Sequence, residues 1–399
     1  MDAAAARRQT GAMSDGAMKD DAGFEAARLT VRLGAITANW RSYRRLAGPC
    51  AVAAVVKADA YGLGAGRIAP SLAAAGCDSF FVARLEEGVA LRALLRGARI
   101  FVLDGAEPDA VPALISQGLI PALNSLAQVA AWSAAAGAAR ASLEAVLHVD
   151  TGMNRLGLPG DELAVLAAQA RQRLAGLNLV LVMSHLACAD APDNKMNAQQ
   201  LSRFKQALAM LPPAPASLAA SHGAFLSPDY HFDLVRPGVA LYGGNPQPDS
   251  GKMGSQNLMQ AAAILTGKVL QVRRIDSGES VGYAASFRAK RPSMLATVAL
   301  GYADGIPRSL SNQGFAALGG GRAPIVGRVS MDMLVLDVTE LPDVRPGDEA
   351  ELLGEAVTLS EVAQAAGTNE YEILTRLRRA PKHYQEASAS AGVTKENRP

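Results

Sequence analysis

The 399-residue chain has few cysteines, no long apolar run and no excess of charge of either sign. Its three cysteines, Cys50, Cys77 and Cys188, lie far apart and form no CxxC pair, which argues against a disulfide framework and indicates a reducing compartment. The 39 basic and 37 acidic residues nearly balance, so the composition gives no basis for binding nucleic acid or an anionic membrane. No apolar run could span a bilayer, and the charged N-terminus lacks the apolar segment of a secretion signal. We therefore expect a globular protein of the cytoplasm.

Several common site motifs are also missing. The sequence contains no GxxxxGK[ST], no complete GxGxxG and no HExxH, and its five histidines show no spacing typical of metal ligands. The glycine-rich run at 62–66 resembles a fragment of a dinucleotide-binding loop, but it directly follows Lys57 in a predicted loop. We therefore expect neither a nucleotide nor a metal as cofactor.

Between Leu29 and about Gly243 the chain alternates short apolar runs with segments rich in Ala, Leu and Arg. This alternation predicts parallel strands connected by helices. About eight strands are predicted, which favours a (β/α)8 barrel, with an open doubly wound sheet as the alternative. The clearest predicted helices cover 85–96, 125–137, 161–176 and 195–210.

The pattern changes after about residue 250. The segment 245–254 is rich in Pro, Gly and Ser, which is typical of a linker. Strand-like runs separated by turns follow it and predict a mostly antiparallel β domain, which ends with helices over 359–366 and 370–379. We therefore divide the chain into a flexible tail (1–27), the barrel (28–255), the β domain (256–390) and a frayed C-terminal tail (391–399).

Polar residues follow the predicted barrel strands at the points where the strands end. They are Lys57, Tyr61, His148, Asp150, Arg155, His185, Ser221, His222 and Arg236. Each alone has an ordinary interpretation: Lys57 as a lysine with a buried stem, His185 as a core histidine, Arg155 as an ion-pair partner of Asp150. Because the active sites of such barrels lie at the carboxyl ends of their strands, the coincidence favours one shared site.

A lysine in a pocket of low dielectric has a lowered pKa and can react with a carbonyl group to form a Schiff base. Pyridoxal phosphate is the commonest cofactor held in this way. The backbone amides near Gly238 and Val239, with the hydroxyl of Ser221, would suit its phosphate. The residues themselves thus point to a pyridoxal-phosphate site at Lys57.

Five motifs, in this order, closely resemble those of the alanine racemases: AVVKADAYGLG, HVDTGMNRLG, HFDLVRPGVALYG, GYADGIPR and GRVSMDM. The resemblance runs from about Leu29 to Tyr384. It implies a pyridoxal-phosphate barrel followed by a β domain, and a head-to-tail homodimer in which each site includes residues of the partner. It also implies that the protein interconverts L-alanine and D-alanine and supplies D-alanine for peptidoglycan.

The resemblance implies roles for individual residues as well. Lys57 would carry the cofactor and act as the base on one face of the substrate Cα, and Tyr302 from the other subunit would act on the opposite face. Arg236 would face the pyridine nitrogen, and His185 would lie near the ring and assist Tyr302. Arg155 would bond the phenolic oxygen of the cofactor. The groups expected at the phosphate are Tyr61, Ser221, Gly238, Val239 and Tyr384, and those expected at the substrate are Arg155 and the main chain of Met331.

The sequence departs from the family pattern at two places. Many members have a lysine, often carbamylated, where this chain has His148, so we predict no carbamate here. The family's Asn-Ser pair near the phosphate is Ser221-His222 in this chain, which leaves open which of the two acts there.

Other functions also fit parts of the pattern. Pyridoxal-phosphate decarboxylases combine a barrel with a β domain, but they are expected to use a C-terminal cysteine, and none follows Cys188. A broad-specificity amino-acid racemase would share the same chemistry. A non-catalytic pyridoxal-phosphate protein would need only the barrel, so the β domain with Tyr302 argues against it.

Overall fold

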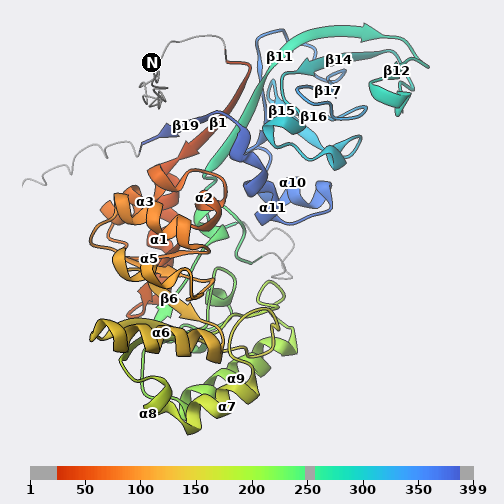
Figure 1. Ribbon diagram of the computed structural model, residues 1–399. Helices are drawn as coiled ribbons and strands as arrows, with labels where there is room; N and C mark the ends of the chain where they lie inside the picture. Colours follow the sequence, from red (N-terminus) through yellow and green to blue (C-terminus); the bar gives the residue numbers. More distant parts are fainter. Residues whose placement is uncertain (1–24, 248–256, 387–399) are drawn as a thin grey trace, which may run out of the picture.

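The computed structural model describes residues 25–247 and 257–386, which form a barrel and a β domain (Figure 1). Residues 1–24 of the predicted N-terminal tail, most of the predicted linker and the predicted frayed end lie outside the described residues. The described helices include none that is long and apolar enough to cross a membrane.

Eight parallel strand positions make up the barrel. The first is split into β2 (Ala51–Val52) and β3 (Ala54–Val55), and β3 starts a run of parallel pairings that continues through β9. The last strand, β10 (Leu234–Val235), pairs with β2, and a bridge between Ala220 and Arg236 connects it to the chain beyond β9. The sheet therefore closes on itself, so the predicted (β/α)8 barrel is confirmed and the open sheet is wrong. The remaining strands are β4 (Ser79–Val82), β5 (Arg99–Val102), β6 (Ile120–Leu123), β7 (Leu143–His148), β8 (Leu177–Met183) and β9 (Ala216–Ser217).

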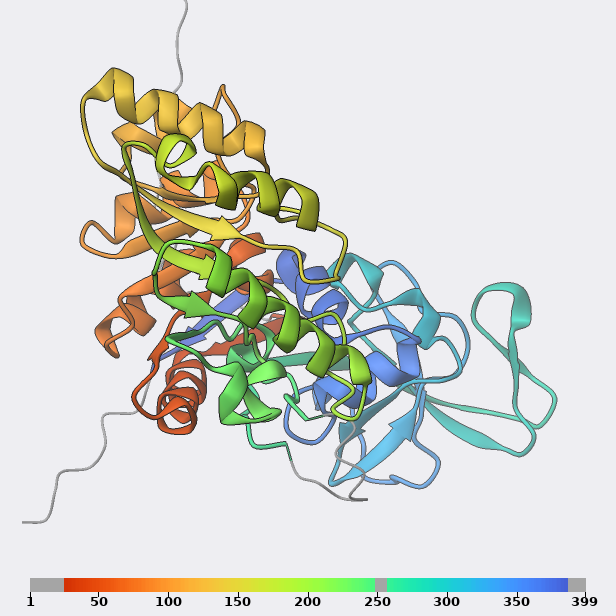
Figure 2. The same cartoon turned by 90° about the horizontal axis from the view of Figure 1, so that it is seen from below.

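Helices surround the barrel, and most of the strand residues are therefore buried (Figure 2). The predicted helix over 195–210 is confirmed as α9 (Lys195–Met210), which Asn194 caps by accepting from Met196 N. The predicted helix over 161–176 is instead two helices, because the backbone leaves the helical conformation at Gln169. The barrel helices are α1 (Leu33–Ala47), α2 (Lys57–Tyr61), α3 (Ala65–Ala74), α4 (Leu85–Leu94), α5 (Val111–Ser116), α6 (Leu126–Ala139), α7 (Gly160–Ala168), α8 (Ala170–Arg173) and α9.

The β domain contains one eight-stranded sheet with the order β16-β15-β18-β11-β1-β19, to which β14 and β17 are added through β11. Every pairing in it is antiparallel except that of β1 with β19, so the predicted antiparallel domain is confirmed. Its strands are β1 (Ala27–Arg32), β11 (Ala263–Ile275), β14 (Ser293–Val298), β15 (Phe315–Leu318), β16 (Gly321–Pro324), β17 (Leu334–Asp337), β18 (Glu349–Leu353) and β19 (Lys382–Gln385).

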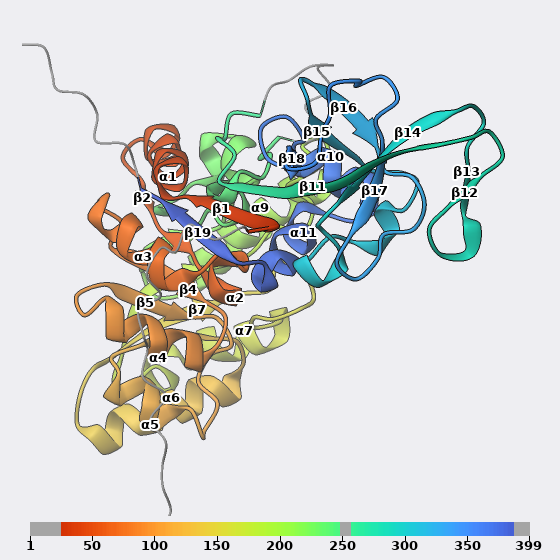
Figure 3. The same ribbon diagram turned by 90° about the horizontal axis from the view of Figure 1, so that it is seen from above.

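The first and last strands of the described chain lie side by side in this sheet (Figures 1 and 3). The sequence analysis begins the barrel at residue 28, whereas the structure places β1 between β11 and β19 of the β domain. A short strand carries no local signal for its partner, so only the tertiary pairing corrects this assignment. A separate hairpin of β12 (Ser280–Val281) and β13 (Phe287–Arg288) lies at the tip of the β domain, away from the barrel (Figure 3).

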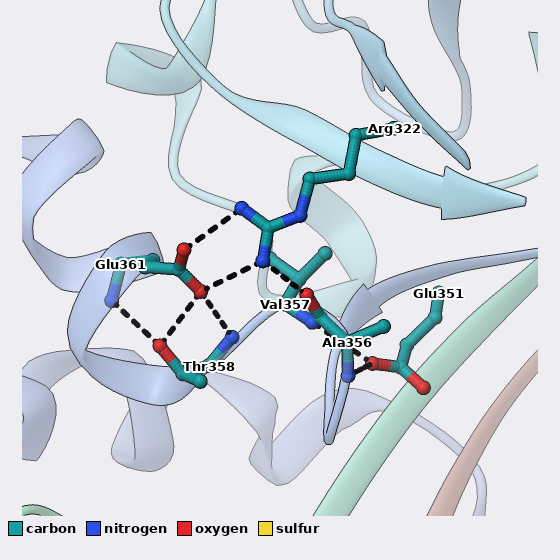
Figure 4. A network of polar contacts seen from close by, with 6 residues as sticks. All are labelled: Arg322, Glu351, Ala356, Val357, Thr358 and Glu361. Carbon is teal, nitrogen blue, oxygen red and sulfur yellow. Dashed lines mark hydrogen bonds and ion pairs between the residues drawn. The ribbon is translucent and has the colours of Figure 1, made fainter. Parts of the chain in front are cut away.

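Two helices, α10 (Leu359–Ala366) and α11 (Glu370–Arg376), lie between the sheet and the barrel (Figure 1). A polar network fixes the start of α10 (Figure 4). Thr358 and Glu361 form a capping box, and Arg322 on β16 donates to both carboxylate oxygens of Glu361, at 2.8 and 3.3 Å. The short 3-10 helices are η1 (Gly223–Phe225), η2 (Pro228–Tyr230), η3 (Val239–Tyr242), η4 (Tyr283–Ala285), η5 (Tyr302–Asp304), η6 (Arg308–Leu310) and η7 (Leu377–Arg379).

Candidate active site

Lys57 directly follows the first barrel strand and begins α2, which has an unusual backbone. Ala58, Asp59, Ala60 and Tyr61 all have positive φ, between 52° and 57°, so the turn after Lys57 is left-handed. A left-handed helical residue other than glycine costs about 1–2 kcal/mol. Four in succession persist only where the surrounding structure fixes them, and such places are often functional sites.

Contacts at both sides hold this left-handed turn in place. Asp59 Oδ1 accepts from Ala65 N at 2.7 Å, which joins the turn to the first residue of α3. The Tyr61 ring packs against the Tyr242 ring with 4.8 Å between the centroids, and the Tyr242 hydroxyl donates to the carbonyl oxygen of Val55 at 2.8 Å. The strand before Lys57 and the turn after it are therefore tied to the same part of the barrel.

The surroundings of Lys57 favour its neutral form. Burial lowers the pKa of the amine most, the positive charge of Arg155 lowers it further, and Glu87 and Asp104 act in the opposite direction. The pKa of His185 also lies well below its usual value, because of burial and the positive charges of Arg236 and Arg155. The strand ends therefore combine an amine of lowered basicity with an uncharged imidazole.

Arg236 is a fixed cation inside the barrel. Its side chain is 5% exposed, and it donates to the carbonyl oxygen of Ser184 at 2.7 Å and to the hydroxyl of Ser217. Burial lowers its pKa to about 10, so it stays protonated at neutral pH. A cation that cannot leave this position suits the role that the sequence analysis gives it, facing a ring nitrogen.

Ser221, Gly238 and Tyr61 come together at the carboxyl end of the barrel. Ser221 Oγ accepts from Gly238 N at 2.9 Å and from Ala240 N at 3.4 Å, and the side chain is buried. A Cβ atom at Gly238 would lie 2.3 Å from the Tyr61 hydroxyl oxygen, so only glycine leaves room for that hydroxyl. Val239 then begins η3. Hydroxyls and backbone amides gathered at the start of a helical turn fit a phosphate group.

Tyr384 and Tyr371 differ in their relation to this cluster. Tyr384 on β19 donates to the carbonyl oxygen of Leu63 at 3.1 Å, and the described residues show no contact between it and Ser221 or Gly238. Tyr371 on α11, which the sequence analysis did not name, lies 6.0 Å from Tyr61 between ring centroids. Its ring also lies 6.4 Å from that of His222, next to Ser221. No sequence motif marks Tyr371; the packing of α11 against the barrel brings it there.

His148 and Arg155 occupy the segment around the end of β7. His148 Nδ1 lies 2.7 Å from Asn124 Oδ1, and Asn124 Nδ2 already donates to two carbonyl oxygens. The amide oxygen must therefore accept, so His148 carries its proton on Nδ1 and its Nε2 has a free lone pair. Burial and the charge of Arg236 lower the pKa of His148 to about 4, so it is neutral. Asp150 accepts from the amides of residues 152–154, and Arg155 is left exposed.

Tyr302 and Met331 lie together in the β domain. Tyr302 N donates to Ser330 O at 3.0 Å, and Ala303 N donates to Met331 O at 2.8 Å. A Cβ at Gly301 would lie 2.3 Å from Met331 O, so glycine is needed for this close approach. The side chains of Tyr302 and Met331 are nevertheless 38% and 60% exposed.

Tyr283 is a second exposed tyrosine near this segment, and the sequence analysis did not name it. It lies in η4 between the strands of the β12–β13 hairpin and is 70% exposed. A Cβ at Gly327 would lie 2.9 Å from Val281 O, so the hairpin packs on the start of the GRVSM segment that ends at Met331. The described contacts include no hydrogen bond or ring contact that joins Tyr283 or Tyr302 to Lys57.

The chain matches both domains of one known family. The N-terminal domain of alanine racemase matches residues 31–246, and its C-terminal domain matches residues 262–384. The alanine racemase of Rhodospirillum rubrum is 49% identical over 363 residues, which cover 90% of this chain and 96% of that protein. The catabolic alanine racemase of Agrobacterium fabrum is 46% identical over 361 residues, covering 90% of this chain and 92% of that protein.

A solved structure agrees with the sequence comparisons. The alanine racemase of Bartonella henselae, solved with covalently bound pyridoxal phosphate, superposes with a TM-score of 0.85 at 41% identity. The match covers 90% of this chain and all of that chain. With both domains matched and nearly half of the residues identical to those of a full-length relative, the chain belongs to the alanine racemase family.

Proposed function

We propose that this protein interconverts L-alanine and D-alanine with pyridoxal phosphate as its cofactor. The observation that carries the proposal is the position of the Lys57 amine, whose pKa is lowered, at the barrel end that also holds the Ser221–Gly238–Tyr61 cluster. The covalently bound pyridoxal phosphate of the Bartonella henselae relative supports it.

The residues present fit this cofactor. When bound, pyridoxal phosphate bonds to a lysine amine and withdraws electrons from the substrate Cα, so that a proton can leave that carbon. Lys57 would hold it covalently, and Arg236 would keep a positive charge facing its ring nitrogen. The groups that would hold its phosphate are Tyr61, Ser221, Gly238, Val239 and Tyr371. Tyr384 becomes a weaker candidate, because its hydroxyl already bonds the carbonyl of Leu63.

Racemisation requires a proton to leave one face of Cα and another to arrive on the opposite face, so two bases serve it better than one. We propose Lys57 for the first face and a tyrosine from the β domain of a partner subunit for the second. The sequence analysis names Tyr302 for this role, and Tyr283 is a second candidate. Exposure favours Tyr283, since a side chain that acts on another molecule must project from its own.

Charged and polar groups at the barrel rim would orient the substrate. Arg155 is exposed, and it is close enough to Lys57, His148 and His185 for its positive charge to lower the pKa of each of them. We propose that Arg155 and the main chain at Met331 of the partner subunit bind the substrate, and that Arg155 also bonds the phenolic oxygen of the cofactor. The neutral Nε2 of His148 is an acceptor that could hold the Arg155 guanidinium without a carbamate.

We further propose that the D-alanine product serves peptidoglycan synthesis. Relatives include proteins named simply alanine racemase and others named catabolic, so a catabolic role is the second candidate. Expression in a strain that depends on added D-alanine tests whether the enzyme can supply it. Growth on L-alanine alone is expected, and continued dependence on D-alanine would contradict the proposal.

The direct experiment combines a spectrum with a reaction. The purified protein should show a visible absorbance band that borohydride removes, peptide mapping should place the reduced adduct on Lys57, and L-alanine should become racemic. A band without turnover would favour the non-catalytic binding protein. Faster turnover of larger amino acids than of alanine would favour the broad-specificity racemase.

A further inference from the structure

Glu87 connects the turn that carries Lys57 to a neighbouring helix. Its Oε1 accepts from Ala58 N, in the residue directly after Lys57, at 2.7 Å. Its Oε2 accepts from Ala83 N at 2.8 Å and from Arg84 N at 3.2 Å, at the start of α4. The carboxylate of Glu87 thus links Ala58, 29 residues earlier in the chain, to the start of α4.

The Ala58 amide is the donor at the start of the left-handed turn. Inside the turn, Ala60 N donates to Val56 O and Gly62 N to Ala58 O, both at 2.8 Å. The described backbone bonds include none donated by Ala58 N, so Glu87 provides its acceptor. Ala58 is the first residue of the turn with a positive φ. This bond therefore lies where the backbone enters the left-handed conformation, one residue after Lys57.

Capping of α4 does not account for the whole contact. A capping-box glutamate needs only to accept from the backbone at the start of its own helix, which Oε2 of Glu87 already does. Oε1 instead accepts from Ala58 N, beyond the end of a different strand, β3. The negative charge of Glu87 also raises the pKa of Lys57, against the effect of burial. Among the described residues, the side chain of the adjacent Glu86 has one polar contact, a long ion pair with Arg84 at 3.8 Å between side chains that are both largely exposed.

We propose that Glu87 is a positioning residue for Lys57: by holding the Ala58 amide it fixes the left-handed turn and thereby the direction of the Lys57 side chain. This inference rests on the proposed function, in which the Lys57 amine must meet the substrate Cα. A misplacement of a reacting group by about 1 Å can reduce a rate by about 10²-fold, so a bond one residue away is well placed to matter.

The test compares Glu87→Gln and Glu87→Ala with the matched controls Glu86→Gln and Glu86→Ala in the cofactor-loaded enzyme. The glutamine amide can accept from Ala58 N, but its NH2 group cannot accept from Ala83 and Arg84 N. We expect kcat to fall by about 10-fold in Glu87→Gln and by about 100-fold in Glu87→Ala, with KM for L-alanine within about twofold of the controls. The Glu86 variants should keep the parental values.

Hydrogen exchange provides a readout that does not depend on activity. In the peptide covering residues 56–64, Glu87→Ala should gain one rapidly exchanging amide, that of Ala58, and Glu87→Gln should lose only part of the protection of that amide, while the rest of the chain keeps its protection. The inference is overturned if the Glu87 variants match the Glu86 controls in kcat and exchange, or if protection is lost throughout the barrel. If Glu87→Ala does not fold, Glu87→Gln decides alone. Failure of the proposed function would look different, since parental enzyme would then carry no borohydride-stabilised adduct on Lys57.

Discussion

The carboxyl end of the barrel and the exposed face of the β domain differ in the burial of their candidate functional side chains. At the barrel end, Ser221 and Arg236 are buried and bonded within the chain. On the β domain, backbone hydrogen bonds hold Tyr302 and Met331, while the side chains of Tyr283, Tyr302 and Met331 stay exposed. In the proposed function, the barrel end is therefore the part of the cofactor site that one chain supplies. The exposed side chains of the β domain would be covered by the second subunit that we propose.

The strongest test of this comparison mixes two inactive proteins. Lys57→Ala should reduce racemisation by at least about 10³-fold, and the double variant Tyr283→Phe, Tyr302→Phe should also be severely slowed. If sites are shared, a mixed dimer contains one intact site, made of Lys57 from one subunit and the tyrosines from the other. Random exchange of equal amounts should restore about a quarter of the parental activity.

Differently tagged subunits verify that mixed dimers form in this experiment. Mixing Lys57→Ala with a variant that carries all three substitutions should restore nothing. Mixed dimers without recovered activity would show that each site lies within one chain, and the comparison would fail. Each single tyrosine variant then shows which tyrosine is the base, because loss of the base should stop exchange of the Cα hydrogen of L-alanine with solvent while D-alanine, deprotonated by Lys57, keeps exchanging.

The buried, neutral His148 in the barrel makes the free energy of unfolding depend on pH in the acidic range. Its pKa is lowered from 6.5 to about 4, so between these values the unfolded chain binds more protons than the native one. The contribution of His148 to the free energy of unfolding is therefore constant above about pH 6.5 and falls as the pH drops toward 4, by on the order of 3 kcal/mol. In His148→Gln this acid loss should shrink in denaturant unfolding series between pH 7.5 and 4. An equal loss in His148→Gln would contradict the assignment, and His383→Gln is the control, at a half-buried position on β19 beside Glu25.

Gly238→Ala should damage the cofactor site without touching the β domain. The new Cβ would lie 2.3 Å from the Tyr61 hydroxyl oxygen, so this hydroxyl must move away. We expect affinity for pyridoxal phosphate to fall at least about tenfold and the free energy of unfolding by about 1–3 kcal/mol. Absorbance titration measures the first and denaturant unfolding the second. The control is Gly137→Ala in α6, where a Cβ meets nothing within 4 Å; equal behaviour of the two would refute the close approach.

The smallest expected effect is a difference in cofactor affinity between variants of Tyr371 and Tyr384. Tyr371→Phe removes a hydroxyl from the ring that packs near Tyr61, and we expect a loss of roughly three- to tenfold in cofactor affinity. Tyr384→Phe removes a bond to the carbonyl of Leu63 and should change this affinity by less than about twofold. A larger loss of cofactor affinity in Tyr384→Phe than in Tyr371→Phe would support Tyr384 as a phosphate ligand, as predicted from the sequence.

Much of the fold followed from local patterns. The helix over 195–210 is bounded by a capping asparagine, and the helix over 359–366 begins with a Thr–Glu capping box, so the sequence alone predicts both correctly. The eight strands were predictable because apolar, β-branched runs alternate with helical segments. Lys57, Ser221 and Arg236 could be named as candidate site residues because each ends or follows such a run.

Other features could not be predicted from local patterns. The segment after Lys57 is interpreted from the sequence as a loop, whereas the structure has a left-handed turn there that is held by contacts with Tyr242, α3 and α4. Tyr371 and Tyr283 carry no motif signal, because what distinguishes them is packing in one case and exposure in the other.

The sequence alone predicted most of the strands and helices correctly, favoured a barrel followed by a β domain, and singled out Lys57 as the proposed cofactor lysine. It could do so because hydrophobic period, caps and strand-end residues are local properties. The tertiary structure alone decided that β1 joins the C-terminal sheet, that Tyr371 rather than Tyr384 contacts Tyr61, and that the turn after Lys57 is left-handed. These depend on contacts between residues far apart in the chain, whose free energy exceeds local preference and leaves no mark in any short stretch of sequence.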